Sequence, residues 1–235
     1  MTVPIGQWKQ DRPAVAIGIP LSWSLSRTAV FQYFDLIKNL RTDDHLLINH
    51  AVAIPSEARN WLIQNFLKLP RKVRYLLLFD DDMTIPPGTV ERMTFHGQPF
   101  VSGLCTQKVP PFYPTAYVHE NVDPHVLEGY EHYGAVDMNY INVVLKRDSG
   151  VREVHAVGAA CLCLRRDLLE KIPAPWFKFE GGGEDFYFCR RVREAGERVL
   201  VDTSVCPGHL GEHIATIDTF NPDAVATREY RVGKN

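Results

Sequence analysis

The chain has 235 residues, of which 45% are hydrophobic and 23% are charged, and its formal net charge is −2. This composition fits one globular domain and gives no indication of a nucleic-acid-binding surface. No apolar stretch approaches the roughly 18–20 residues of a membrane-spanning helix, and residues 1–13 lack the features of a secretory signal. The five cysteines include no zinc-type pair, so we expect reduced thiols and a cytoplasmic protein.

The first half of the chain alternates between expected strands and expected helices. Pro20 is expected to stop the first strand, and Ser56 suits the N-cap of the second helix. The β-α-β order predicts an α/β fold with a mostly parallel central sheet, helices on its faces and ligands beyond the carboxyl ends of the strands. The expected strands cover 14–19, 45–54, 75–79 and 100–104, and the expected helices cover 28–40, 56–69 and about 86–95.

The second half is less regular. Residues 108–117 form a loop rich in proline and aromatic residues, and 119–140 show no clear period. Because no linker is visible, we expect a single domain. The remaining expected elements are a strand at 154–164, a helix at 167–172, a helix at 184–195 that Gly196 closes at its C′ position, and a strand at 198–201.

Three consecutive carboxylates, Asp80, Asp81 and Asp82, follow the expected strand at 75–79. Carboxylates clustered at a strand end need a cation, protons or a ring of hydrogen-bond donors. Oxygen ligands of this kind suit Mg²⁺ or Mn²⁺, which commonly bridge a carboxylate to phosphates. In an extended segment Asp80 and Asp82 would face the same side and Asp81 the other, so the first and third could share a metal. The alternative interpretation is a solvated turn.

Three other segments carry residues that suit chemistry. Arg59 lies in the first turn of an expected helix, where free N–H groups and the helix dipole favour an anion such as phosphate. Glu184 and Asp185 follow three glycines at a helix start, which suits a general base beside a flexible loop. His209 lies between glycines after a strand, where an imidazole could complete a metal site. The structural alternatives are a surface ion pair, a helix cap and a structural histidine.

Taken in order, these motifs resemble the GT-A glycosyltransferases, particularly their family 2-like branch. The Asp-x-Asp motif at 80–82 is followed about a hundred residues later by the Glu-Asp pair, and then by His209. The resemblance covers roughly residues 14–213. Other stretches similar to that branch are ARN, GLCTQKVPPFYP, AVGAACLCLRRDLLE, EDFYFCRRVREAG and GHLG.

The resemblance implies a GT-A fold, a metal ion and a nucleotide-diphosphate sugar donor, most simply a UDP- or GDP-sugar. It implies that Asp80, Asp82 and His209 hold Mn²⁺ or Mg²⁺. Arg59 would support the diphosphate. Asp80 would also lie near the ribose, and Asp81 would reach the base, the ribose or a backbone partner.

The resemblance also implies roles around the sugar and the acceptor. Ile19, Pro20 and the end of the strand expected at 45–54 would line the base pocket. Gly158 and Ala159 would let the backbone approach the donor sugar. Asp185 would deprotonate an acceptor hydroxyl, and Glu184 would contact the acceptor or the sugar. Direct attack by that hydroxyl inverts the anomeric carbon, although a similar metal set also occurs in retaining enzymes.

The same resemblance divides the single domain, residues 1–235, into three parts. A nucleotide-binding half covers about 14–105, an acceptor and catalytic half covers about 106–217, and 218–235 form a tail. The stretches 108–117 and 119–140 would shape the acceptor side. No Gln-x-x-Arg-Trp motif is present, which favours a single-transfer enzyme without a membrane span over a polymer synthase.

Two other functions remain open on the sequence. A nucleotidyltransferase acting on a sugar phosphate normally needs a glycine- and basic-rich loop, whereas residues 17–28 contain one glycine and one arginine. A non-catalytic nucleotide-sugar-binding module would keep the donor site without turnover. A homo-oligomer is compatible with either alternative and with the enzyme.

Overall fold

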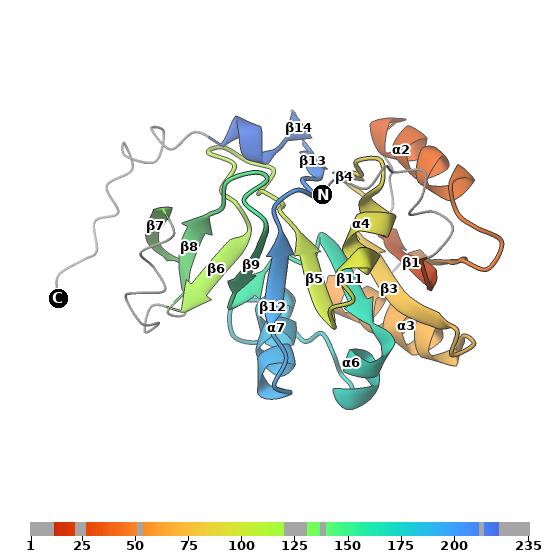
Figure 1. Ribbon diagram of the computed structural model, residues 1–235. Coiled ribbons are helices and arrows are strands. Elements are labelled where there is room, and N and C mark those ends of the chain that lie inside the picture. Colours follow the sequence, from red (N-terminus) through yellow and green to blue (C-terminus); the bar gives the residue numbers. More distant parts are fainter. Residues whose placement is uncertain are drawn as a thin grey trace.

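The computed structural model describes residues 12–21, 27–50, 54–119, 131–136, 140–211 and 214–220 (Figure 1). A central sheet has the strand order β2-β1-β3-β11-β5-β12-β9, and two smaller sheets have the orders β10-β6-β8-β7 and β14-β13-β4. The elements are β1 (Ala14–Leu21), α2 (Arg27–Lys38), β2 (His45–His50), α3 (Pro55–Lys68), β3 (Val73–Phe79), β4 (Met83–Thr84), α4 (Thr89–Phe95), β5 (Phe100–Gly103), β6 (Ala116–His119), β7 (Glu131–Val136), β8 (Tyr140–Val144), β9 (Val151–Val154), β10 (Ala156–Val157), β11 (Cys161–Arg165), α6 (Arg166–Lys171), α7 (Glu184–Glu194), β12 (Val199–Asp202), β13 (Gly208–Leu210), β14 (Ile214–Ala215) and the short 3₁₀ helix η1 (Ile217–Thr219).

Most strands of the central sheet run in one direction. β2, β1 and β3 are parallel neighbours, and β5 pairs in parallel with β12. β11 lies antiparallel between β3 and β5, and β9 lies antiparallel to β12 at the edge. The predicted α/β class, with a mostly parallel central sheet flanked by helices, is therefore confirmed. Among the described helices, none has both the length and the apolar character needed to cross a membrane.

Helices cover both faces of the central sheet because its strands are apolar on both sides. In β3, Leu76 and Leu78 enter the core cluster that also contains apolar residues of α3, α6 and α7. Leu77 and Phe79 alternate with them and enter the cluster that includes residues of α2 and α4. A strand buried on both faces reads as a continuous apolar run, which is why the sequence identified this strand clearly.

Helix α3 begins before the residue that the sequence predicted as its cap. Ile54 is the N-cap, Pro55 occupies the first turn, and no side chain caps the helix. Proline is well suited to this place, because its fixed φ is already helical and it has no N–H to leave unpaired. Ser56 lies buried within the first turn, so the predicted N-cap is wrong by two residues.

Two strand predictions also need correction. β1 continues through Pro20 to Leu21. Its pairing with β3 ends at Gly18, so the missing N–H of Pro20 removes no hydrogen bond between β1 and β3. The single strand predicted at 154–164 is three strands, with a turn after Gly158. β10 pairs with β6 in the small sheet, whereas β11 returns to the central sheet.

Arg166, the first residue of α6, caps the C-terminal end of α3. Its buried guanidinium donates hydrogen bonds of 3.0–3.2 Å to the main-chain oxygens of Phe66, Leu67, Leu69 and Val73. It also lies 4.4 Å from the centre of the Phe66 ring. The last carbonyls of a helix lack the usual partners within the helix, so this side chain supplies donors to them; the Phe66 carbonyl also accepts from the Leu69 N–H at 3.0 Å.

The substitution Arg166→Met should lower the free energy of unfolding by about 2–3 kcal/mol, because it removes charge-assisted hydrogen bonds and leaves buried carbonyls without donors. Urea unfolding measures the loss. Arg165→Met is the control at the neighbouring arginine, since Arg165 pairs with the exposed carboxylate of Asp167 and donates to one carbonyl, that of Gly97. A loss below about 1 kcal/mol is expected there. Equal losses in the two variants would contradict the capping role.

Candidate active site

Residues 80–82 form a turn directly after β3, at the carboxyl edge of the central sheet. The Tyr33 hydroxyl, from α2, donates a hydrogen bond to the main-chain oxygen of Asp80. The Leu210 N–H, from β13, donates to the main-chain oxygen of Asp82 at 2.7 Å. Segments far apart in the chain therefore hold the backbone of the three aspartates.

Because this segment turns instead of extending, Asp80 and Asp82 have different partners. Asp80 contacts Arg59, whereas Asp82 contacts His209 and Lys108. The extended arrangement expected for the three aspartates is wrong. Within the described ranges, no three histidine, cysteine or carboxylate side chains are grouped to hold a metal. The ligand set of Asp80, Asp82 and His209 stays a prediction.

Arg59 joins two carboxylates of the site; it is the fifth residue of α3 and so lies just beyond the first turn in which the sequence placed it. Its Nη2 donates to both carboxylate oxygens of Asp80, at 2.7 and 2.9 Å, and its Nη1 donates to Glu184 Oε1 at 2.8 Å. The Arg59 side chain is only 6% exposed. Burial raises the pKa of Asp80, and the Arg59 guanidinium opposes that shift. The hydrogen bonds compensate for the cost of removing these charges from water.

His209 and Lys108 both contact the same carboxylate oxygen of Asp82. His209 Nε2 lies 3.2 Å from Asp82 Oδ2, and its Nδ1 lies 2.8 Å from the main-chain oxygen of Thr106. Lys108 Nζ donates to the same Asp82 oxygen at 2.9 Å. Burial alone would raise the pKa of Asp82, but the hydrogen bonds from His209 and Lys108 lower it to about 2.

Both ring nitrogens of His209 face oxygen atoms, an arrangement that favours the doubly protonated ring. Burial alone would lower its pKa, but the hydrogen bond to Asp82 raises it overall. A histidine that ligates a metal typically donates its other N–H to a carbonyl, as His209 does to Thr106. A carboxylate and an imidazole held in this way fit a divalent cation that would take the place of the Nε2 proton.

Asp185 and Glu184 lie side by side in sequence but in different environments. Glu184 is bound to Arg59, whereas Asp185 Oδ2 accepts a hydrogen bond from the Ala159 N–H at 3.3 Å. Burial raises the pKa of Asp185 to about 6, the charges of Glu184 and Asp80 add to the shift, and Arg59 opposes it. Asp185 is therefore ionised at neutral pH but more basic than an ordinary carboxylate, as a general base requires.

The loop before α7 needs the glycines that the sequence supplies. Gly181, Gly182 and Gly183 all have positive φ, and Gly183 is the N-cap residue of α7. Three successive residues with this backbone geometry are strained for any other amino acid. The glycine run therefore sets the direction in which Glu184 and Asp185 leave the loop.

The structure places the other predicted residues as follows. Pro20 lies near the end of β1, opposite Asn49 of β2. The Gly158 N–H donates to the Thr115 carbonyl at 3.0 Å, and a Cβ at Gly158 would lie 3.1 Å from the Thr115 side chain. Ala159 is buried beside Asp185. Their roles toward a donor stay predictions. Parts of the regions predicted to line the donor and acceptor sites lie outside the described residues, namely 51–53, 120–130 and 137–139.

Sequence reasoning missed two partners of the aspartates, Lys108 and Tyr33. Lys108 belongs to the segment KVPP, a loop whose path no local pattern predicts. Tyr33 lies on α2 and is buried against the sheet. The one available signal was the charge itself, because three carboxylates in a row require nearby donors.

No protein-family model matches the chain, and no curated protein matches it. The chain is similar to a solved structure titled "Crystal Structure of A197 from STIV", with a TM-score of 0.58, 20% identity, and coverage of 88% of this chain and 91% of that one. It also aligns with the catalytic domain of Drosophila beta1,4galactosyltransferase 7 in complex with xylobiose, with a TM-score of 0.45, 13% identity, and coverage of 82% of this chain and 66% of that one. The first similarity shows a shared fold, and neither shows a shared activity.

The substitution Asp185→Asn should stabilise the protein above about pH 6 and leave its stability unchanged near pH 4. Between the ordinary pKa of 3.8 and the folded value of about 6, the folded chain binds more protons than the unfolded chain. Stability is therefore lost as pH rises through this window, and the neutral amide avoids the loss, which is worth about 3 kcal/mol for a pKa difference of about two units. Urea unfolding across this pH range measures the difference.

Asp167→Asn is the control for this experiment, because the Arg165 guanidinium lowers the pKa of Asp167. It should give no gain at any pH. The assignment fails if Asp185→Asn changes stability by the same amount at the acidic and the neutral end.

Proposed function

We propose that this chain is a metal-dependent glycosyltransferase of the GT-A type, which moves a sugar from a nucleotide-diphosphate sugar to an acceptor hydroxyl. The observation that carries the proposal is the pairing of Asp82 with His209 at the strand edge where Arg59 also links Asp80 to Glu184. These residues are far apart in sequence, and their order resembles that of the GT-A glycosyltransferases. Asp185, next to this network, supplies a carboxylate of raised pKa.

In this proposal Asp82 and His209 hold Mn²⁺ or Mg²⁺, with Asp80 beside them. When bound, the cation supplies positive charge to the departing diphosphate. Arg59 positions Asp80 next to the diphosphate through its hydrogen bonds to the Asp80 carboxylate. Asp81, Pro20, Gly158 and Ala159 would border the nucleotide and the donor sugar, as the family resemblance implies. A UDP- or GDP-sugar is the donor class that this arrangement favours.

The chain's own residues remove a proton from the acceptor hydroxyl and position the reacting groups. Asp185 takes the proton from the acceptor hydroxyl, and the hydroxyl oxygen forms a bond to the anomeric carbon. The bond between that carbon and the diphosphate oxygen breaks, and the nucleoside diphosphate leaves with the electron pair. Such direct displacement inverts the anomeric carbon. Glu184 cannot share this role easily, because its carboxylate is bound to Arg59 at 2.8 Å, so we assign it to positioning.

A thermal-shift panel of nucleotide sugars with and without Mn²⁺ tests the proposal. A donor at about a hundred times its Kd stabilises the folded state by about 2.7 kcal/mol, which corresponds to roughly 5–10 °C in Tm. We expect this shift only when Mn²⁺ is present. Asp82→Asn should abolish it, whereas Asp81→Asn, the matched neighbour, should keep most of it.

Three outcomes would contradict the proposal. The first is that no UDP-, GDP- or dTDP-sugar binds with Mn²⁺. The second is release of pyrophosphate from a nucleoside triphosphate and a sugar phosphate, which would identify a nucleotidyltransferase. The third is donor binding without transfer or donor hydrolysis under any condition, which would identify a binding module.

Lys108 offers a separate test of the metal position. Its ammonium occupies the Asp82 oxygen that the cation would use, so it competes with the metal in the free protein. Lys108→Met should therefore tighten Mn²⁺ binding by about two- to fivefold, the range expected from losing one exposed ion pair. Titration calorimetry with Mn²⁺ alone measures this change.

Lys72→Met serves as the control, because Lys72 is exposed on the approach to β3 and has no contact with Asp82. It should leave Mn²⁺ affinity unchanged. Unchanged or weaker Mn²⁺ binding in Lys108→Met would show that the metal does not use the Asp82 oxygen that Lys108 occupies.

A further inference from the structure

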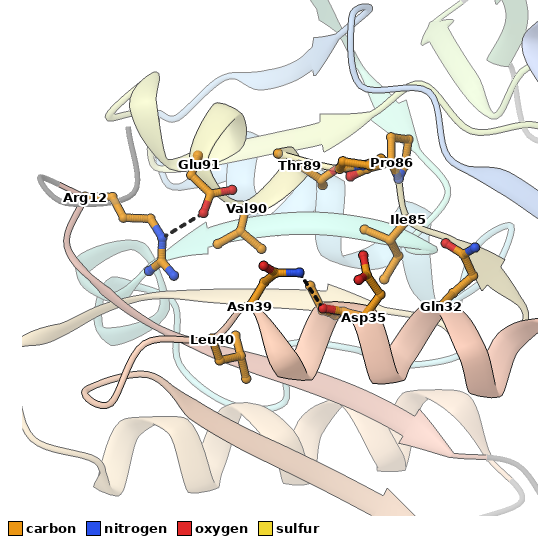
Figure 2. Close-up of a pocket in the computed structure, with 13 residues that line it drawn as sticks. Arg12, Gln32, Asp35, Asn39, Leu40, Ile85, Pro86, Thr89, Val90 and Glu91 are labelled. Carbon is orange, nitrogen blue, oxygen red and sulfur yellow. Dashed lines mark hydrogen bonds and ion pairs between the residues drawn. The ribbon is translucent and has the colours of Figure 1, made fainter. Parts of the chain in front are cut away.

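A cavity of about 130 Å³ lies between α2 and the segment that leads into α4 (Figure 2). None of its lining residues belongs to the candidate active site. Its walls combine apolar side chains with amides and three charged groups. The lining residues are Arg12, Gln32, Asp35, Leu36, Asn39, Leu40, Ile85, Pro86, Pro87, Gly88, Thr89, Val90 and Glu91.

Among the described lining residues the one cation is Arg12, and it pairs with Asp44, which lies outside the lining. Its Nη1 and Nη2 donate to the two carboxylate oxygens of Asp44, at 2.9 and 2.5 Å. Its side chain is buried, and its Nε has no hydrogen bond. The carboxylate of Asp44 therefore largely neutralises the positive charge of Arg12, and little of that charge acts on the cavity.

Glu91, at the start of α4, is a buried carboxylate with weak compensation. Its side chain is 8% exposed, and its ion-pair partner among the described residues is Arg12 Nε at 3.5 Å, too long for a good hydrogen bond. A buried carboxylate normally accepts several hydrogen bonds. Since Glu91 lines the cavity, a donor inside the cavity would satisfy it.

Asp35, on α2, places a second carboxylate at the rim of the same cavity. Its main-chain oxygen accepts a hydrogen bond from Asn39 Nδ2 at 2.7 Å (Figure 2). Its side chain has no ion pair with any described residue. The charged lining therefore consists of two carboxylates and one arginine that is shared with Asp44, which favours a cation as the occupant.

The apolar part of the lining limits the size and the nature of that cation. Ile85 and Val90 are 8% and 5% exposed, and Leu36 and Leu40 pack against the same core cluster. An apolar cavity of roughly 150 Å³ holds about six heavy atoms, as benzene binding shows. The space therefore suits a short aliphatic chain that carries a hydrogen-bond donor, and not a bare metal ion, which needs a full shell of oxygens.

We propose that this cavity binds a small alkylammonium ion, such as a short aliphatic mono- or diamine. The ammonium group donates to the Glu91 carboxylate, the methylene groups lie on Ile85 and Val90, and Asp35 attracts the cation at the rim. The occupant would contact α2, the helix whose Tyr33 holds the main-chain oxygen of Asp80. The proposal does not depend on the glycosyltransferase assignment.

The test is titration of the full chain with butylamine, diaminobutane and butanol at constant ionic strength. Isothermal calorimetry or ligand-observed NMR gives the three affinities. We expect saturable binding of both amines and binding of butanol that is weaker by about tenfold or more, because butanol has the same shape without the charge.

Variants place the binding at this cavity. Glu91→Gln and Asp35→Asn should each weaken amine binding by about tenfold, the loss expected for one hydrogen bond to a charged group. Glu57→Gln, on an exposed residue outside the lining, should have no effect. If Glu91→Gln does not fold, Asp35→Asn at the exposed rim decides the question.

Any of three results would overturn the proposal. Butanol could bind as tightly as butylamine, which would make the cavity merely apolar. Amine binding could be unchanged in the variants, which would place it elsewhere. The third result is the absence of saturable amine binding at millimolar concentration.

Discussion

The candidate site depends on one buried guanidinium. Arg59 links Asp80, 21 residues away in sequence, to Glu184, 125 residues away. Without a cation between them, these carboxylates and the neighbouring Asp185 would repel one another in surroundings that exclude water. Because Arg59 is hydrogen-bonded on both sides, the end of β3 and the start of α7 can meet. The pKa of Asp185 is nevertheless raised, chiefly by burial, and the charges of Glu184 and Asp80 add to the shift that Arg59 opposes.

The sequence predicts elements of the fold well where one local signal dominates. β3 is recognisable because a strand covered on both faces is apolar throughout. The pattern does not show which face of a helix is buried: α2 buries Ala29 and Tyr33 but leaves Phe31 and Phe34 72% and 65% exposed. The sequence also could not divide 154–164 into three strands, because the change of sheet at Gly158 depends on packing against Thr115, which is far away in sequence.

For the candidate site, the sequence identifies residues but not their partners. The acidic groups at 80–82 and 184–185 stand out because adjacent carboxylates need nearby cations, protons or hydrogen-bond donors. The extended geometry assumed for 80–82 failed, because tertiary hydrogen bonds from Tyr33 and Leu210 hold a turn there. Arg59 was interpreted as an anion-binding group from its helix position, and no local rule could show that two carboxylates occupy it.

The positive groups around Asp82 bear on the metal site that we propose there. One Asp82 oxygen lies 2.9 Å from the Lys108 ammonium and 3.2 Å from Nε2 of His209. A divalent cation bound there would displace the Nε2 proton and the ammonium together. Two positive charges would leave the carboxylate and two would arrive, so the local balance would change little. In the proposed enzyme, Lys108 would then be free to pair with a phosphate of the donor.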